Sequence, residues 1–241
     1  MEIFRLEKTD STNTWVTQHE SELGSPCLVY CKEQTAGRGQ RGNSWESEPG
    51  KNITASLLFH PKDLQASEQF KISEAVALAL VDYLHSKGVD ALIKWPNDIY
   101  VGDKKICGIL VEHAVTGRFL MRTIAGFGLN INQTEFRSDA PNPVSLSQLT
   151  GKEYDIQKEV KVLSKYLGTR IDRLRDKNLH VEFEGKLWRN DGKHHLYHDR
   201  LRNELITAKI DKVAQDGILS LITAEGERRD FAFKEIEFIR E

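Results

Sequence analysis

Short apolar segments in the middle of the chain, joined by turns, constrain its fold more than any other feature. The segments cover residues 91–94, 99–101, 105–112 and 119–129, and only turn-like clusters such as residues 95–98 separate them. Connections this short join antiparallel neighbours, whereas parallel strands need a crossover, usually a helix. We therefore expect an α+β fold with a mixed, largely antiparallel sheet flanked by helices.

The rest of the larger part of the chain predicts two more strands and two helices. Residues 28–31 and 52–59 are apolar and favour β structure. Between residues 68 and 86 the apolar side chains recur at helical spacing, and the pattern closes at Gly88. Residues 156–174 repeat this spacing, so we expect a second helix there.

The pattern of the sequence changes near Gly185. Beyond it come short runs that favour β structure, with turn signals at residues 216–217 and 225–226. We therefore predict a main domain of residues 1–185, followed by a small C-terminal β domain of residues 186–241.

Composition excludes several classes of protein. The chain has 241 residues, of which 39% are hydrophobic and 29% charged, as is typical of a globular protein and not of a disordered one. Its 34 basic and 36 acidic residues give a formal charge of -2, so no global basic field indicates nucleic-acid binding. The most apolar stretch, residues 75–81, is far too short to cross a bilayer.

The cysteines and the N-terminal segment indicate a compartment. Cys27, Cys31 and Cys107 cannot all pair and are too few for a disulfide scaffold, which points to free thiols in a reducing environment. The N-terminal segment has neither the apolar stretch nor the cleavage site of a secretory signal. We expect a cytoplasmic protein with no membrane partner.

The segment TAGRGQRGNSW contains the spacing G-x-G-x-x-G, yet its context argues against a dinucleotide site. That fingerprint needs a helix beginning at the third glycine, and here a turn-rich run follows. Arg38 and Arg41 alternate with the glycines, as is typical of a cradle for a carboxylate or a phosphate. A solvated loop with unpaired arginines is the alternative. The nearby Trp45, which could stack on a base, favours the binding site.

Further clusters are candidates for the same site. Residues 94–98, KWPND, combine a cation, an aromatic ring, a rigid turn and two polar side chains, although a turn that ends a strand has the same composition. Lys105 lies in a charged turn before an apolar strand, where a lysine is usually solvated. Gly126 and Gly128 lie inside an apolar strand, which predicts that another group approaches the backbone closely there.

Taken together, five motifs carry a resemblance: DSTN, GRGQRGNSW, KWPNDIY, KKICGILVE and GFGLNIN. In this order and spacing the chain resembles biotin protein ligases, the enzymes that attach biotin to the carrier domains of carboxylases. The resemblance covers residues 3–132, and residues 204–240 resemble the family's small SH3-like domain. The combination of KWPND with a downstream K-x-x-G-I-L-V-E is more specific than any single glycine motif.

The resemblance implies an ATP-dependent ligase. Such an enzyme activates biotin as biotinyl-5′-AMP, releases pyrophosphate, and transfers the acyl group to a lysine of a biotin carboxyl carrier protein. Its substrates are biotin and ATP with Mg²⁺, and it carries no bound prosthetic group. Because the enzyme needs no nucleophile of its own, the absence of a G-x-S-x-G motif agrees with this reaction. Positioning and charge neutralisation are expected to dominate catalysis.

The family pattern also implies roles for individual residues. Lys105 and Arg38 would be catalytic. The residues implied in biotin binding are Ser11, Thr12, Asn13, Gln34, Gly37, Arg38, Gly39, Gln40, Lys105 and Gly108. The residues implied in ATP binding are Arg41, Trp45, Asn97, Asp98, Lys105 and Asn130. Asp98 and Asn130 would also serve the Mg²⁺ ion, which prefers oxygen ligands.

Two other functions remain open at this point. A lipoate or octanoate ligase shares the catalytic fold and related acyl-transfer chemistry. A non-catalytic sensor of biotin or nucleotide belongs to a different class. The GRG segment together with KWPND favours biotin over lipoate, and an intact Lys105 favours an enzyme over a sensor.

The resemblance bears on macromolecular partners as well. Some family members carry an additional N-terminal domain that binds DNA, but only ten residues precede Ser11, so we expect no direct DNA binding. Family members occur as monomers and as dimers, which makes a homodimer one of two states that the resemblance allows. An edge strand near residues 105–112 or 119–129 would provide a pairing surface.

One departure from the family generates a prediction. Gln40 and Asn43 occupy positions where many family members have arginine, and glutamine lacks the fixed charge and the fork of a guanidinium. We expect weaker electrostatic retention of the adenylate than in an all-arginine segment, so Gln40→Arg should slow the release of biotinyl-5′-AMP. Equal release rates for the wild type and the variant, measured on the isolated complexes, would contradict this expectation.

Overall fold

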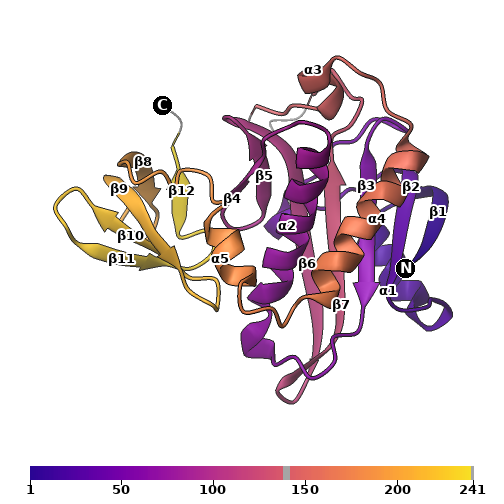
Figure 1. Ribbon diagram of the computed structural model, residues 1–241, viewed down its shortest axis with the longest axis horizontal. Coiled ribbons are helices and arrows are strands. Elements are labelled where there is room, and N and C mark those ends of the chain that lie inside the picture. Colours follow the sequence, from indigo (N-terminus) through magenta and orange to yellow (C-terminus); the bar gives the residue numbers. More distant parts are fainter. Residues whose placement is uncertain (138–141, 240–241) are drawn as a thin grey trace.

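The computed structural model describes residues 1–137 and 142–239, with the side chain of Arg41 outside the described part (Figure 1). Two β-sheets are present. The strands of the first are β1 (Glu2–Thr9), β2 (Cys27–Gln34), β3 (Ile53–Phe59), β4 (Leu92–Lys94), β5 (Asp98–Val101), β6 (Lys104–Thr116) and β7 (Phe119–Leu129). The helices are α1 (Thr12–His19), α2 (Phe70–Ser86), α3 (Leu146–Thr150), α4 (Ile156–Asp172) and α5 (Leu179–Glu184).

The first sheet has seven strands in the order β1-β2-β3-β7-β6-β5-β4. Strands β1 and β2 run parallel, joined by the crossover through α1, and the other neighbouring strands are antiparallel. The prediction of a mixed, largely antiparallel sheet is therefore confirmed. The expected strands and the two long helices are present, whereas β1, α1, α3 and α5 were not predicted.

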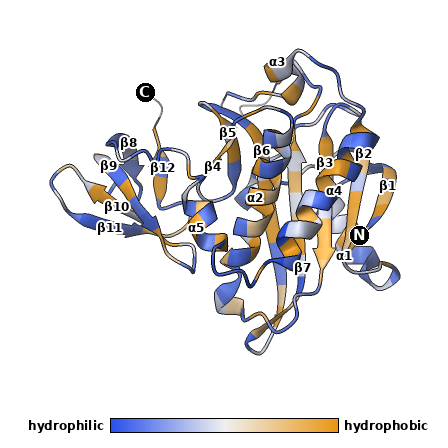
Figure 2. Ribbon diagram, viewed as in Figure 1, coloured by the Kyte–Doolittle hydropathy of each residue, from blue (hydrophilic) through white to orange (hydrophobic). Residues whose placement is uncertain are grey.

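Alternating side chains of the strands pack against helices on both faces of this sheet. Leu28 and Tyr30 of β2 belong to the main core, which includes α2 and α4 (Figure 1). Cys27 and Val29 point to the other face and form a smaller cluster with Val16 of α1. The apolar colouring of α2 and the mixed colouring of α4 in Figure 2 agree with a central and a peripheral position in the core.

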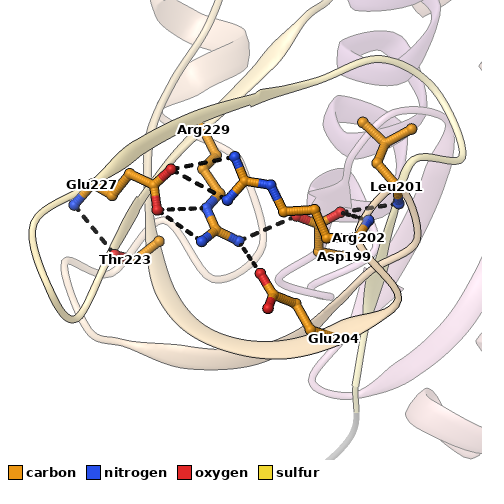
Figure 3. Close-up of polar contacts among 7 residues, drawn as sticks. All are labelled: Asp199, Leu201, Arg202, Glu204, Thr223, Glu227 and Arg229. Atoms are coloured by element: carbon orange, nitrogen blue, oxygen red, sulfur yellow. Dashed lines mark hydrogen bonds and ion pairs between the residues drawn. The ribbon is translucent and has the colours of Figure 1, made fainter.

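The small C-terminal β domain is an antiparallel sheet with the order β11-β10-β9-β8-β12. Its strands are β8 (His195–Asp199), β9 (Glu204–Val213), β10 (Leu219–Thr223), β11 (Arg228–Phe231) and β12 (Ile236–Phe238). Arg229 on β11 donates hydrogen bonds to Asp199, Glu204 and Glu227 (Figure 3). These bonds raise the pKa of Arg229, so its guanidinium group stays charged. The charged group joins β8, β9 and β11 to the turn that contains Glu227.

Contacts between the two sheets fix the small domain beside β4 and β5. The indole Nε1 of Trp95 donates to the backbone oxygen of Gly217 at 2.9 Å. The ring of Trp95 also contacts Phe233, with centroids 6.1 Å apart. Leu187 forms a parallel bridge with Ile93 of β4, so the chain that enters the small domain is itself paired with the first sheet.

The three cysteines are free, as predicted, and the structure shows that all three are buried. Burial raises the pKa of Cys27 to about 11 and also raises the pKa of Cys31 and Cys107, so thiolates are disfavoured at all three positions. Within residues 1–137 and 142–239, no helix combines the length and the apolar character that crossing a membrane requires.

Of the two segments predicted as edge strands, residues 105–112 and 119–129, the second prediction is wrong. Strand β7 lies between β3 and β6, so residues 119–129 do not form an edge. Strand β6 pairs with β5 only through residues 104–108, and its remaining residues pair with β7 alone. The order of strands in space differs from their order in the chain, and local sequence patterns carry no information about that difference.

The buried ion pairs of Arg170 generate a prediction about stability. This side chain of α4 donates to Asp82 of α2 at 2.7 Å and also pairs with Glu182 of α5. Arg170→Ala leaves Asp82 without its cation and Glu182 with only the longer pair to Arg173, at 3.8 Å. We therefore expect a loss of about 2 kcal/mol in the free energy of unfolding, measured with urea.

Arg173→Ala is the matched control for this variant. Arg173 pairs with Asp176 and, at 3.8 Å, with Glu182, but its side chain is 48% exposed, and exposed pairs contribute about 0.5 kcal/mol or less. Equal losses for the two variants would refute the expected role of Arg170 in joining the helices.

Candidate functional site

Most of the site residues that the sequence predicts line a cavity of about 540 Å³. Those that line it are Ser11, Thr12, Asn13, Gln34, Arg38, Gly39, Gln40, Trp45, Asn97, Asp98, Lys105, Gly108 and Asn130. Gly37 does not line the cavity; its backbone oxygen accepts from the N–H of Trp45 at 2.9 Å. The side chain of Arg41 lies outside the described part of the chain.

The topology of the first sheet explains why distant segments meet here. Because β1 and β2 are parallel and Thr9 pairs with Gln34, the segments that follow both strands leave the same edge of the sheet. Strand β3 begins at this edge and β7 ends there, since Ile53 pairs with Leu129. Cys107 of β6 also pairs with Leu129, so Lys105 and Gly108 reach the same edge.

One end of the cavity is polar and uncharged. The backbone N–H of Thr12 donates to Oε1 of Gln34 at 3.0 Å. The hydroxyl of Ser56, on β3 beneath them, lies 2.7 Å from Oγ1 of Thr12 and 2.5 Å from Oδ1 of Asn13. These contacts hold α1 in a fixed position against the sheet. Ser56 was missed because a serine within a strand carries no signal of its own.

Two cations of the cavity are each paired with a carboxylate. Nζ of Lys105 lies 2.7 Å from Oδ1 of Asp98, and Arg38 donates to Glu112 at 3.1 Å. Glu112 also accepts from Nδ2 of Asn13 at 2.6 Å, which joins the uncharged end to the charged one. Glu112 was not among the predicted residues, although it stands in the motif KKICGILVE.

The glycines inside the strands accommodate large neighbours, as predicted. A Cβ atom at Gly128 would lie 2.2 Å from Cε2 and Nε1 of Trp45, and one at Gly108 would lie 2.9 Å from Cζ3 of the same ring. Gly108 and Gly128 are paired across β6 and β7, so the indole rests on bare backbone. At Gly126 a Cβ would meet Oδ1 of Asn13 at 2.2 Å.

Two buried polar atoms of the cavity have no hydrogen-bond partner in the described part of the chain. They are Nε1 of Trp45 and Oδ1 of Asn130, whereas Nδ2 of Asn130 donates to the backbone oxygen of Val144 at 3.1 Å. Unpaired buried polar groups are costly, and they are typical of places where a ligand supplies the partner. A donor and an acceptor are thus available to a bound molecule.

The donor set does not form a metal site by itself. No group of three or more His, Cys, Asp or Glu side chains among the described residues could hold a metal ion. Asp98 and Asn130, both of which line the cavity, contribute one carboxylate and one amide oxygen. Such a pair fits a hard cation that receives its other oxygen ligands from a phosphate-bearing molecule.

Comparison with known proteins assigns the chain to a family. Residues 5–130 match the model of the "Biotin/lipoate A/B protein ligase family". The chain belongs to this family. The matched residues include most of the residues that line the cavity, from Ser11 to Asn130.

Two curated members of the family show how far the similarity extends. The bifunctional ligase/repressor BirA of Bacillus subtilis is 33% identical over 156 residues, which are 62% of this chain and 46% of that protein. The biotin–[acetyl-CoA-carboxylase] ligase of Paracoccus denitrificans is 31% identical over 166 residues, 66% of this chain and 68% of that one. The chain thus matches about half the length of the BirA relative.

Solved structures from the family have the same fold. A biotin protein ligase from Aquifex aeolicus, in complex with biotin and ATP, superimposes with a TM-score of 0.81 at 23% identity, covering 100% of this chain and 99% of that one. A biotin protein ligase from Leishmania major, in complex with biotinyl-5-AMP, gives 0.67 at 20% identity, with coverages of 96% and 99%. The expected fold, including the small C-terminal domain, is confirmed.

The contact between the indole of Trp45 and the backbone of Gly128 generates a prediction. Gly128→Ala would force the ring of Trp45 off the strands, because the new methyl group overlaps the indole. We expect the segment around Arg38 to lose its anchor, so that trypsin cleaves after Arg38 several-fold faster, as followed by mass spectrometry.

Gly185→Ala serves as the control, since its Cβ would meet nothing closer than 3.4 Å. In a Trp45→Ala background, Gly128→Ala should not change the cleavage rate further, because both substitutions remove the same contact between the indole and the strand. An unchanged cleavage rate in Gly128→Ala would show that the indole does not anchor this segment.

Proposed function

We propose that the chain is an ATP-dependent ligase that activates biotin as biotinyl-5′-AMP and transfers it to a lysine of a biotin carboxyl carrier protein. The observation that carries this proposal is the arrangement of uncharged, cationic and aromatic groups in one cavity. An uncharged hydrogen-bonding end adjoins two cations, and these adjoin an indole and an amide with unpaired polar atoms. Biotin joined to an adenylate has the same order of groups.

The uncharged end suits the neutral head group of biotin. Ser11, Thr12, Asn13 and Gln34 offer hydrogen-bonding groups without net charge, and Ser56 supports two of them from below. A fused bicyclic urea needs both donors and acceptors, which hydroxyl and amide side chains provide. Because Asn13 is tied to Glu112 and through it to Arg38, a head group bound here would point its acid chain toward the cations.

The central cations suit the reacting groups. In the first step an oxygen of the biotin carboxylate forms a bond to the α-phosphorus of ATP, and the bond to the bridging oxygen breaks as pyrophosphate leaves. Both reactants are anions, so Lys105 and Arg38 would lower the barrier by neutralising charge. In the second step the amine of the carrier lysine attacks the acyl carbon and AMP leaves. No side chain of the ligase becomes covalently attached.

The remaining end suits the nucleotide. The ring of Trp45 offers a face for a purine, with Asn97 and Asn130 at its side of the cavity. Asp98 and Asn130 would hold Mg²⁺ that arrives with the phosphates, where the ion supplies further charge neutralisation. In this proposal, residues 1–185 bind both substrates. A homodimer and the absence of DNA binding remain predictions.

ATP–pyrophosphate exchange tests the proposal and separates its rivals. We expect exchange with biotin and not with lipoate or octanoate, supplied one at a time. Exchange with lipoate or octanoate alone would assign the chain to the other acid specificity of its family, and exchange with none of the three acids would favour a non-catalytic sensor.

The role of Lys105 is tested in the same assay. Lys105→Ala should lower the exchange rate by about 10²–10³-fold, because a well-placed cation in a closed site contributes this much. Lys104→Ala is the matched control, since Lys104 precedes it on β6 and is exposed. Comparable exchange rates in Lys105→Ala and Lys104→Ala would refute the assignment of Lys105.

A further inference from the structure

Among the described residues that line the cavity, one cation forms no ion pair with a carboxylate. Among the cavity-lining side chains that the structure describes, Lys105 is paired with Asp98 and Arg38 with Glu112. Lys234 also lines the cavity, and it forms no ion pair within residues 1–137 and 142–239. Its charge is therefore the least neutralised of the three. The sequence does not single out this residue, because it lies far along the chain from every motif.

Lys234 comes from the small β domain and lines the cavity together with residues of the first sheet. It stands in the turn between β11 and β12, next to Phe233, whose ring contacts Trp95. Trp95 is also held to Gly217 of the same domain, and it begins the turn that contains Asn97 and leads to Asp98 at the start of β5. The contact of its neighbour Phe233 with Trp95 thus ties Lys234, as a lining residue of the cavity, to the segment that leads to Asn97 and Asp98.

The backbone of Lys234 supports a role for its side chain. Its φ angle is 70°, in the left-handed region that glycine adopts easily and side-chain-bearing residues rarely do. Strained backbone of this kind concentrates at binding sites, where a particular side chain has to be held in place. The turn alone would be formed more easily by glycine.

We propose that Lys234 binds the β- and γ-phosphates of ATP, the part that leaves as pyrophosphate. The inference rests on the proposed function and adds a residue of the small domain to its nucleotide site. When the α-phosphorus accepts the carboxylate oxygen, the electron pair of the broken bond leaves with pyrophosphate. The ammonium group of Lys234 stabilises this charge without giving up a proton. The small domain thereby completes the site for ATP and leaves the site for biotin unaffected.

Two substitutions separate charge from backbone conformation. Lys234→Gly removes the charge and suits the φ angle, so the folded protein keeps or gains thermal stability. Lys234→Arg keeps the charge and retains the strain. We expect Lys234→Gly to raise the KM for ATP in pyrophosphate exchange by about tenfold, with the KM for biotin changed less than twofold, as the loss of one charge-assisted contact implies. Lys234→Arg should stay within about threefold of the wild type.

Titration calorimetry with ATP, and separately with inorganic pyrophosphate, measures binding without any acid substrate. Lys212→Ala, on β9 of the same domain, is the matched control and should bind both as the wild type does. An unchanged affinity for ATP and pyrophosphate in Lys234→Gly would overturn the proposal, as would equal losses in the Gly and Arg variants. A wild type that binds ATP but exchanges with none of the acids would refute the proposed function and still test Lys234.

Discussion

The parallel pairing of β1 with β2 is the constraint on which the candidate site depends. Sheets built from hairpins place successive loops at opposite edges, but this one pair, with Thr9 beside Gln34, sends two segments out of the same edge. The first segment carries the hydrogen-bonding side chains, and the second carries the glycines and arginines. Without that register, α1 and the glycine-rich segment would lie at opposite ends of the sheet.

The charged part of the cavity is arranged in advance of any ligand by its own carboxylates. Asp98 and Glu112 hold Lys105 and Arg38 in position, at the expense of part of their positive field. An incoming anion has to share each cation with a carboxylate already present. The carboxylates thus reduce the electrostatic attraction for an anion but fix the geometry of the two cations, which in the proposed reaction would favour precise placement of two anionic reactants.

Local patterns predicted the features that arise locally. The periodicity of residues 68–86 predicted a helix, which is α2 (Phe70–Ser86). Gly126 and Gly128 predicted a close approach to the strand, and the side chains that approach are those of Asn13 and Trp45. The roles of Ser56 and Lys234 depend on which strands become neighbours in space, and no local pattern carries that information. The same limit explains the wrong edge at residues 119–129, because β3 covers β7 from a distant part of the chain.

The bond between Trp95 and Gly217 joins residues 122 positions apart, and this separation affects how the protein forms during synthesis. Translation delivers the chain from the N-terminus, so Trp95 leaves the ribosome long before its partner exists. Until then the indole lacks its hydrogen bond to Gly217 and its contact with Phe233, so this turn is without its support from the small domain. The part of the cavity that contains Asn97 and Asp98 is consequently completed late, after the strands of the first sheet have all been synthesised.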